Sequence, residues 1–477
     1  MSGVITPLSL PAEASAESSI VHLEKATELV KVQSPAGQLP AKQGWCSFTR
    51  WLHYSAFDYY RKIFTIIFTA NLIAFIVITV KNDGHPSAPA VGNATAANLM
   101  IALLFRQEHV VNLCYKLACL CPRSAPLWLR ARLAKVFHYG GAHSGAGASA
   151  ATWHILYTAV LTRDYIRSSS NWALAMLVTS YFLVALFVFI LVVAHPTLRR
   201  RYHDSFEAVH RFSGWLALAT FWMHTIFAAL HTRSIESNQH SIGHILIHTP
   251  SFWMLCVSTS CLLLSWGYLR LRPVIPEVLS NHATRLHFNY RRMGPIHGIK
   301  VSTRPLMEWH SFATIPHSEE EGKGFSLIVS NAGDWTRNCI TSPPAKLWIR
   351  GVPLLGLLHS AHLFKKVVVV ATGSGVGPCM SLFAANAAPC RIFWSTPSPL
   401  VTYGAEIIEA VKRVDPEAWI WDTRTDGRPD MVAVTYKLFV EAQAEAVFII
   451  SNPKLTKQVV YGMESRGIPA YGAIWDS

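Results

Sequence analysis

The sequence predicts a bundle of six membrane-spanning helices followed by two cytosolic domains, the second of which has an α/β fold. Three observations lead to this fold class. Six apolar stretches, each about as long as a helix that crosses a bilayer, lie before residue 270. The chain of 477 residues is 51% hydrophobic and only 15% charged, which is more apolar than an ordinary soluble protein. The segment VVVVATGSGVGP at 367–378 reads as a buried strand that runs into a glycine-rich turn.

The six apolar stretches are the predicted membrane spans. They cover residues 63–80, 98–121, 137–161, 172–195, 208–231 and 250–269. The second stretch differs because it contains Arg106, Glu108, His109 and Lys116, and charged side chains are costly in the hydrocarbon region. A helix that lies partly in the membrane interface is therefore the alternative for this stretch.

Basic residues set the predicted orientation. Lys and Arg total 42 against 28 Asp and Glu, which gives a formal net charge of +14. They gather before the first span, after the second, after the fourth and after the sixth, so six spans place all four clusters on one side. Positive clusters mark the cytosolic side. Both termini are thus expected in the cytosol, in a multi-pass protein of the plasma membrane or an endomembrane whose partner is the lipid bilayer and not nucleic acid.

Candidate metal ligands are histidines, because the nine cysteines form no CxxC pair. His210 and His224 lie on one face of the fifth span, about 21 Å apart and near opposite leaflets. His143 and His154 also share a face of the third span but lie only about 16 Å apart. We pair His143 with His210 and His154 with His224 as axial ligands of haem b. A single haem, no haem, and imidazoles that only hydrogen-bond a neighbouring helix are the alternatives.

The glycines after the predicted strand suit a phosphate group. Without a Cβ atom, the backbone lets its N–H groups approach a pyrophosphate, and the start of the next helix favours an anion. A tight strand-to-helix turn without a ligand explains the same pattern. The residues concerned are Gly373, Ser374, Gly375, Gly377 and Pro378.

The order of several motifs resembles one protein superfamily. After the predicted spans come Trp309-His310-Ser311-Phe312-Ala313, Gly333-Asp334-Trp335-Thr336, the glycine segment and Gly427-Arg428-Pro429. From about residue 60 to residue 477, this order resembles the ferric reductase and NADPH oxidase superfamily, and within it the TmpA-like integral membrane flavoproteins of fungi. The resemblance implies a ferredoxin-reductase-like module, in which a β-barrel domain binds FAD and an α/β domain binds NADPH or NADH.

The resemblance also implies roles for individual residues. His310, Ser311, Phe312 and Ala313 would line the flavin ring, although Ser311 replaces the usual Pro and Ala313 the usual hydroxyl residue. The FAD pyrophosphate would lie at Gly333, Asp334, Trp335 and Thr336. The glycine segment would hold the nicotinamide nucleotide, with Arg391, Arg424 and Arg428 as candidates for its 2′-phosphate. Ser451, which stands where the family has Cys, and Trp475, which matches a terminal aromatic that stacks on flavin, are the catalytic candidates.

These expectations define four regions and one function. The regions are a flexible cytosolic tail (1–60), a transmembrane domain (61–272), an FAD-binding domain (273–362) and an NAD(P)-binding domain (363–477). The expected function is electron transfer from NAD(P)H through FAD and transmembrane haem to a small-molecule or metal-chelate acceptor, such as a ferric or cupric chelate or dioxygen. A haem-free, membrane-anchored FAD oxidoreductase and a catalytically weak signalling protein are the alternatives. The sequence predicts no oligomeric state.

Overall fold

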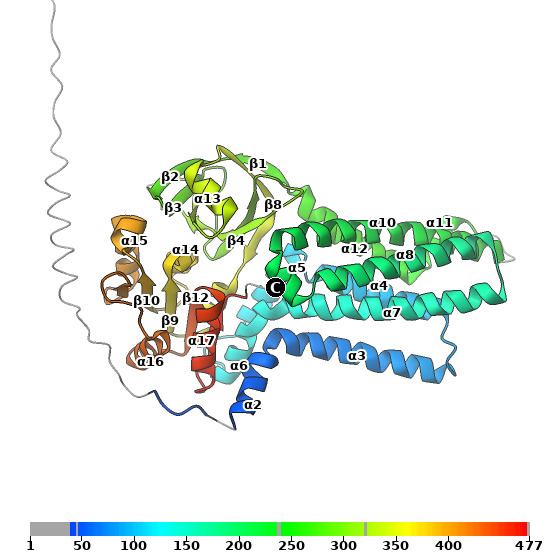
Figure 1. The fold of residues 1–477 in the computed structure, drawn as a ribbon, viewed down its shortest axis with the longest axis horizontal. Coiled ribbons are helices and arrows are strands. Elements are labelled where there is room, and N and C mark those ends of the chain that lie inside the picture. Colours follow the sequence, from blue (N-terminus) through cyan, green and yellow to red (C-terminus); the bar gives the residue numbers. More distant parts are fainter. Residues whose placement is uncertain (1–38, 44–45, 236–239, 319–321, 475–477) are drawn as a thin grey trace, which may run out of the picture. The chain divides into compact units, whose positions relative to one another are not determined.

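The computed structural model describes residues 39–43, 46–235, 240–318 and 322–474. Most of the predicted tail, and Trp475, lie outside these residues. The chain from Pro40 onward forms one unit. Along the sequence, this unit consists of a helical part, an antiparallel β part and a parallel α/β part (Figure 1).

The long helices of the helical part lie side by side (Figure 1): α7 contacts α3, α4 and α8, while α10 packs on α8 and α12 packs on α4. Glycines permit the closest approach, because a Cβ atom on Gly141 would lie 2.3 Å from the carbonyl oxygen of Tyr60. The segments of this part are α2 (Ser47–Trp51), η1 (Leu52–Ala56), α3 (Tyr59–Lys81), α4 (Ala88–Leu104), α5 (Glu108–Cys119), α6 (Leu127–Leu133), η2 (Ala134–Tyr139), α7 (Gly140–Arg167), α8 (Asn171–Val193), α9 (Pro196–Arg201), α10 (His203–Ile235), α11 (Ile242–Ile247) and α12 (Pro250–Gly267).

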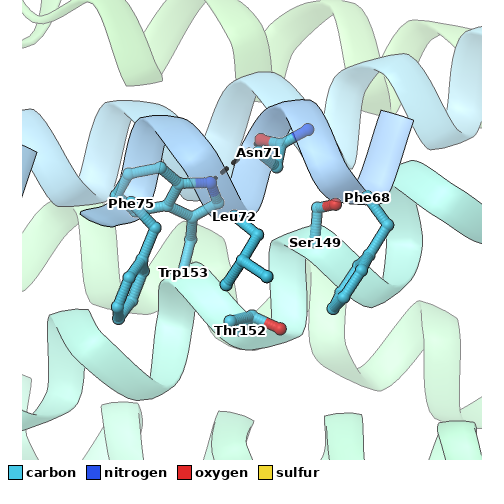
Figure 2. Close-up of a pocket in the computed structure, with 7 residues that line it drawn as sticks. All are labelled: Phe68, Asn71, Leu72, Phe75, Ser149, Thr152 and Trp153. Carbon is cyan, nitrogen blue, oxygen red and sulfur yellow. Dashed lines mark hydrogen bonds between the residues drawn. The ribbon is translucent and has the colours of Figure 1, made fainter. Parts of the chain in front are cut away.

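A polar cluster joins α3, α4 and α7 inside the helical part. The Oδ1 atom of Asn71 accepts hydrogen bonds from Trp153 Nε1 at 2.9 Å and from Asn98 Nδ2 at 2.7 Å. These bonds satisfy groups that are costly to leave unpaired in an apolar environment. Figure 2 shows Asn71 and Trp153 beside a small pocket, which is also lined by Phe68, Leu72, Phe75, Ser149 and Thr152.

The expected six membrane spans are not confirmed. Among the described residues, three helices (α3, α8 and α10) are long and apolar enough to cross a membrane, or four if the bent pair of α4 and α5 is one span. α4 and α5 meet at 73°, so the second predicted stretch is broken at 105–107. α7 is rich in Gly, Ala, Ser and Thr, and α12 carries Ser258, Thr259 and Ser260 at its centre, which lowers the apolarity of both helices.

The antiparallel β part consists of two four-stranded sheets around one core. Their strand orders are β1-β8-β4-β5 and β2-β3-β7-β6. Both sheets contribute buried side chains to this core, including Val301, Leu347, Phe288 and Phe325. The elements are β1 (Arg270–Pro273), β2 (Ile275–Ser280), β3 (Ala283–Phe288), β4 (His297–Ser302), β5 (His310–Ala313), β6 (Ile315–Pro316), β7 (Phe325–Ser330), α13 (Asp334–Thr341) and β8 (Lys346–Leu355).

The α/β part is a five-stranded parallel sheet with the order β11-β10-β9-β12-β13. All four valines of β9 are fully buried, as expected for a central parallel strand with helices on both faces. The elements are η3 (Leu357–Leu363), β9 (Val367–Thr372), η4 (Gly373–Gly375), α14 (Val376–Ala385), β10 (Cys390–Thr396), α15 (Pro399–Val414), β11 (Trp419–Asp422), α16 (Met431–Glu441), β12 (Ala446–Ile450), α17 (Pro453–Glu464) and β13 (Ala470–Gly472).

The helical segment from α5 to η2 docks on the α/β part. Arg130 is nearly inaccessible, and its guanidinium donates to both carboxylate oxygens of Glu445, at 2.7 and 3.0 Å. The same guanidinium donates to the carbonyl oxygen of Leu363 at 2.8 Å. The Tyr471 hydroxyl donates to the carbonyl oxygen of Ala131 at 2.9 Å. Arg130 belongs to the basic cluster after the second predicted span. A residue that suggested a membrane flank in the sequence thus joins the helical part to the α/β part.

Replacing Glu445 by Gln should lower the melting temperature, because it leaves a buried guanidinium without its carboxylate. A broken buried pair typically costs about 3–5 kcal/mol. Glu441→Gln is the matched control: its carboxylate forms a more exposed pair with Lys437 at 3.6 Å, typically worth less than about 1 kcal/mol. Tryptophan fluorescence during heating in detergent measures both variants, and equal losses would contradict this account.

The same comparison should depend on pH. The hydrogen bond from Arg130 lowers the pKa of Glu445, so its contribution is present above the unfolded pKa of about 4.3. That contribution is lost as the pH falls through the lower folded pKa. The difference in melting temperature between wild type and Glu445→Gln is therefore expected to shrink below about pH 4 and to stay constant between pH 6 and pH 8.

Candidate functional site

The strand order of the parallel sheet creates one position where a ligand can enter. β10 and β12 flank β9; the connection after β9 leads to β10 on one side, whereas the connection after β12 leads to β13 on the other side. Loops that follow two such strands diverge and leave a crevice at the carboxyl edge. Thr372 ends β9 and Ser451 follows β12, and their hydroxyl oxygens lie 2.5 Å apart. The crevice therefore lies beside the predicted residue Ser451.

The glycine turn begins at this crevice, and two of its glycines are required by the geometry. A Cβ atom on Gly375 would lie 2.2 Å from the carbonyl oxygen of Ile450, so only glycine lets the turn pack against β12. Gly373 has φ +51°, and its carbonyl oxygen accepts a hydrogen bond from Trp394 Nε1 at 2.9 Å. Because Trp394 is fully buried in β10, its side chain is held in place and fixes the position of the turn.

Helix α14 begins directly after the turn, with Gly375 as its N-cap and without a side-chain cap. The N–H group of Val376 already donates to the carbonyl oxygens of Gly373 and Ser374, and Pro378 has no N–H group, so this helix start offers fewer donors to an anion than a regular one. Ser374 is exposed at the entrance. Gly377 and Pro378 form the first turn of the helix, and a Cβ atom on Gly377 would only touch Ile328 of β7, at 3.4 Å. Cys379 follows, but burial raises the pKa of its thiol, so it stays protonated and unreactive.

The three candidate arginines lie at two opposite edges of the sheet. Arg391 lies near the start of β10, at the end of the strand opposite to the crevice, where it is partly buried and pairs with Asp415 at 2.9 Å, so it is not placed to bind the nucleotide. Arg424 and Arg428 follow β11 and are exposed on the carboxyl edge. The Asp422 carboxylate shapes this loop by accepting hydrogen bonds from the backbone N–H groups of Arg424 and Ser398, both at 2.8 Å.

The two motifs of the antiparallel β part come together. The His310 ring on β5 stacks on the Trp335 ring at the start of α13, with centroids 4.1 Å apart. Phe312 lies 5.9 Å from the same indole. Ser311 is exposed, and Ala313 pairs with Gly298 of β4. α14 contacts β5 and β6, so this pair of motifs lies next to the crevice of the parallel sheet.

The start of α13 resembles an anion site. Gly333 precedes the helix, and a Cβ atom there would meet nothing within 4 Å. The Thr336 hydroxyl closes the turn by accepting hydrogen bonds from the N–H groups of Ala332 and Gly333, at 2.8 and 2.9 Å. Asp334 and Arg337 are exposed and 3.6 Å apart. Gly333 is itself exposed, and none of the described residues other than its two chain neighbours lies within 4 Å of where its Cβ atom would be.

A buried charge cluster that the sequence did not reveal connects the helical part to the antiparallel β part. Glu108 is 2% exposed and pairs with Lys300 of β4 at 3.2 Å. Arg350 of β8 lies over the rings of Trp309 and Trp266, at 4.6 and 4.9 Å from their centroids. Burial lowers the pKa of Arg350 to about 10. The only local signal was a carboxylate in an apolar stretch, and its partners lie far away in the sequence.

The four predicted haem ligands are mostly engaged by other groups. Both ring nitrogens of His224 are hydrogen-bonded, to the Tyr157 hydroxyl at 2.8 Å and the Thr179 hydroxyl at 2.9 Å. The Nε2 atom of His154 lies 3.2 Å from the carbonyl oxygen of Ser180. The His143 and His210 rings do approach, with centroids 6.2 Å apart. Over the described ranges there is no group of three or more His, Cys, Asp or Glu that could hold a metal ion, so haem gains no support.

Comparison with known proteins indicates a different relationship from the one expected. Residues 357–477 match the family model of the C-terminal domain of adenylate-forming reductase 03009. Adenylate-forming reductase 03009 of Coprinopsis cinerea is 42% identical over 426 residues, which cover 89% of this chain and 41% of that protein. Adenylate-forming reductase 06235 of the same fungus is 40% identical over 428 residues, with the same two coverages. The chain thus spans about two fifths of the length of these relatives.

A solved structure with a similar arrangement is a ferredoxin NADP⁺ reductase from Neisseria gonorrhoeae with bound FAD and NADP. It is 11% identical, covers 43% of this chain and 98% of its own, and has a TM-score of 0.36.

The resemblance to the ferric reductase and NADPH oxidase superfamily was wrong, and so was the function expected from it. The matching family and the curated relatives are adenylate-forming reductases. The motifs that suggested the superfamily are short, and the structure accounts for them locally: a strand-to-helix turn at Gly373, a helix start at Gly333 and a stacked ring pair at His310. Turns, helix starts and ring pairs of this kind occur in many unrelated folds, so they do not identify a superfamily.

The glycine turn gives a matched pair of variants. Gly375→Ala should destabilise the protein by about 1–3 kcal/mol, because its Cβ would collide with the Ile450 carbonyl oxygen. Gly377→Ala should change stability by less than about 0.5 kcal/mol, because its Cβ makes ordinary contact with Ile328. Melting temperatures in detergent measure the difference. A loss for Gly377→Ala as large as that for Gly375→Ala would refute the close approach of the turn to β12.

Proposed function

We propose that this chain is an NAD(P)H-dependent reductase that holds the dinucleotide in the crevice between β9 and β12. The observation that carries the proposal is the coincidence of this crevice with the glycine turn and the uncapped start of α14. The turn offers backbone N–H groups to a pyrophosphate. Arg424 and Arg428 lie on the same edge, where they would meet the 2′-phosphate of NADPH. The match of residues 357–477 to a reductase domain supports the assignment.

We further propose that FAD binds to the antiparallel β part beside this crevice. The residues fit the cofactor at both ends: the open start of α13 suits its pyrophosphate, and the stacked rings of His310 and Trp335 suit a flat ring. When bound, FAD would supply hydride chemistry between NADPH and a second substrate. Gly333 leaves room for the phosphates, Thr336 holds the turn, and α14 brings the nicotinamide site close.

The names of the relatives suggest the substrate. Both are adenylate-forming reductases, and we propose that the present chain supplies reducing equivalents to a carboxyl group activated as an acyl adenylate. A hydride that NADPH supplies through the bound FAD would form the new C–H bond at the acyl carbon. AMP would leave with the electrons of the broken C–O bond, so the products would be an aldehyde, AMP and NADP⁺. Activation would occur in another domain or protein, since the chain matches only part of each relative.

A bilayer is the proposed environment of the helical part. α3, α8 and α10 meet the length and apolarity of membrane spans. Their outward side chains are large and apolar, with Ile66, Ile73 and Val178 each more than half exposed. Such surfaces are unfavourable in water and favourable against lipid tails.

The function is tested with the full chain in nanodiscs, loaded with FAD. NADPH oxidation is followed at 340 nm, and aldehyde and AMP are measured after addition of a synthetic acyl adenylate such as benzoyl-AMP. The proposal predicts tight NADPH binding and equal amounts of aldehyde, AMP and NADP⁺. Failure of the folded protein to bind either dinucleotide would overturn it. Oxidation of NADPH with an artificial acceptor but never with acyl adenylates would contradict only the proposed substrate class.

Trp394 is expected to position the dinucleotide loop. Trp394→Phe removes the N–H group that holds the Gly373 carbonyl oxygen and should raise the Kd for NADH and NADPH alike, by about fivefold for about 1 kcal/mol. Trp253→Phe, which removes a Trp–carbonyl bond of 2.9 Å in the helical part, should leave the Kd unchanged. Isothermal titration measures both. An unchanged Kd for a folded Trp394→Phe would contradict the role.

A further inference from the structure

Helix α5 has two apolar faces on opposite sides. With 100° per residue, Val111, Tyr115 and Ala118 share one side, and all three are buried. Leu113, Leu117 and Leu120 share the other side, and they are 53%, 58% and 75% exposed. An exposed row of three leucines on a helix that is already docked is unfavourable in water.

The buried side of α5 is held firmly against the rest of the protein. The Asn112 side chain donates to the Pro353 carbonyl oxygen and accepts from the Leu355 N–H group, each at 2.8 Å. Val111 and Tyr115 belong to the same hydrophobic core as β9 and α14. Rotation of the helix to bury the leucines would therefore break this core.

Helix α6, which follows α5 in the sequence, also exposes apolar side chains. Leu127 and Trp128 are 37% and 59% exposed, and the guanidinium of Arg132 lies 5.2 Å from the centre of the Trp128 ring. Lys116 is exposed beside the leucines of α5. Exposed leucine, tryptophan and basic side chains are the composition of helices that lie in a membrane interface with anionic lipids.

We propose that the outward face of α5 and α6, defined by Leu113, Leu117, Leu120, Leu127 and Trp128, lies in the interface of the bilayer rather than across it. The inference rests on the proposed membrane location of the helical part. The 73° bend after α4 turns α5 away from a helix that packs within the bundle. The occupant is lipid because this face is continuous in sequence with the bundle and carries basic residues at its border. The dinucleotide site is thereby held at the membrane surface through the opposite side of α5.

The test uses the full chain in nanodiscs with a fluorescent amino acid introduced at one position at a time. Position 117 reports on α5. Position 73, in the middle of α3, reports on the depth of a proposed span, and position 401, a 76% exposed valine on α15, is the control in water. Lipids that carry a doxyl quencher at carbon 5 or carbon 12 measure the depth of each fluorophore.

The proposal predicts that the carbon-5 quencher reduces fluorescence at position 117 about twofold more than the carbon-12 quencher. Position 73 should show the reverse order, and position 401 should be quenched by neither. Stronger quenching from carbon 12 at position 117 would make α5 part of a span, and no quenching there would assign the face to water or protein; either result overturns the inference. An unquenched position 73 would instead overturn the proposed membrane location, and with it the inference.

Discussion

The order of strands in the parallel sheet is the constraint on which the account of this protein depends. Because β9 has β10 on one side and β12 on the other, only the loops after β9 and β12 separate at the carboxyl edge. The glycine turn lies at this point, and its residue Gly375 packs against the backbone of β12. A hydrogen bond from Trp394 fixes the glycine turn, and a hydrogen bond between Thr372 and Ser451 joins the ends of β9 and β12. α14 then leads from the same turn to the antiparallel β part, so both proposed cofactors meet at one place.

The segment between α4 and α7 joins the three parts of the protein. Glu108 at its start reaches Lys300 of the antiparallel β part, and Arg130 reaches Glu445 of the α/β part. Buried pairs of this kind tolerate loss of neither partner, because the remaining charge would be left without solvation. The segment thus sets the position of the proposed dinucleotide site relative to the helices. Its outward leucines would extend the same connection to lipid.

Local patterns predicted the buried strand β9 and the turn between this strand and the next helix. The valines of β9 predicted a buried strand, and the glycines after it predicted the turn that follows. The α/β fold could therefore be recognised from the sequence. The six spans predicted from apolarity are not confirmed, and α7 owes its tight packing to small residues such as Gly141 rather than to long apolar ones. Trp394, Glu108 and Arg130 could not be assigned from the sequence, because each acts through a partner that only the folded chain brings near. Short motifs also misled the family assignment, because unrelated proteins build phosphate sites alike.

Hydrogen–deuterium exchange of the full chain in nanodiscs, with and without NADP⁺, tests the central claim most directly. Exchange of backbone N–H groups reports protection by a bound ligand. The account predicts that NADP⁺ slows exchange in peptides that contain residues 372–378 and 450–453, and leaves α16 unchanged. Protection by saturating NADP⁺ that spares residues 372–378, or lies elsewhere in the chain, would contradict the proposed site.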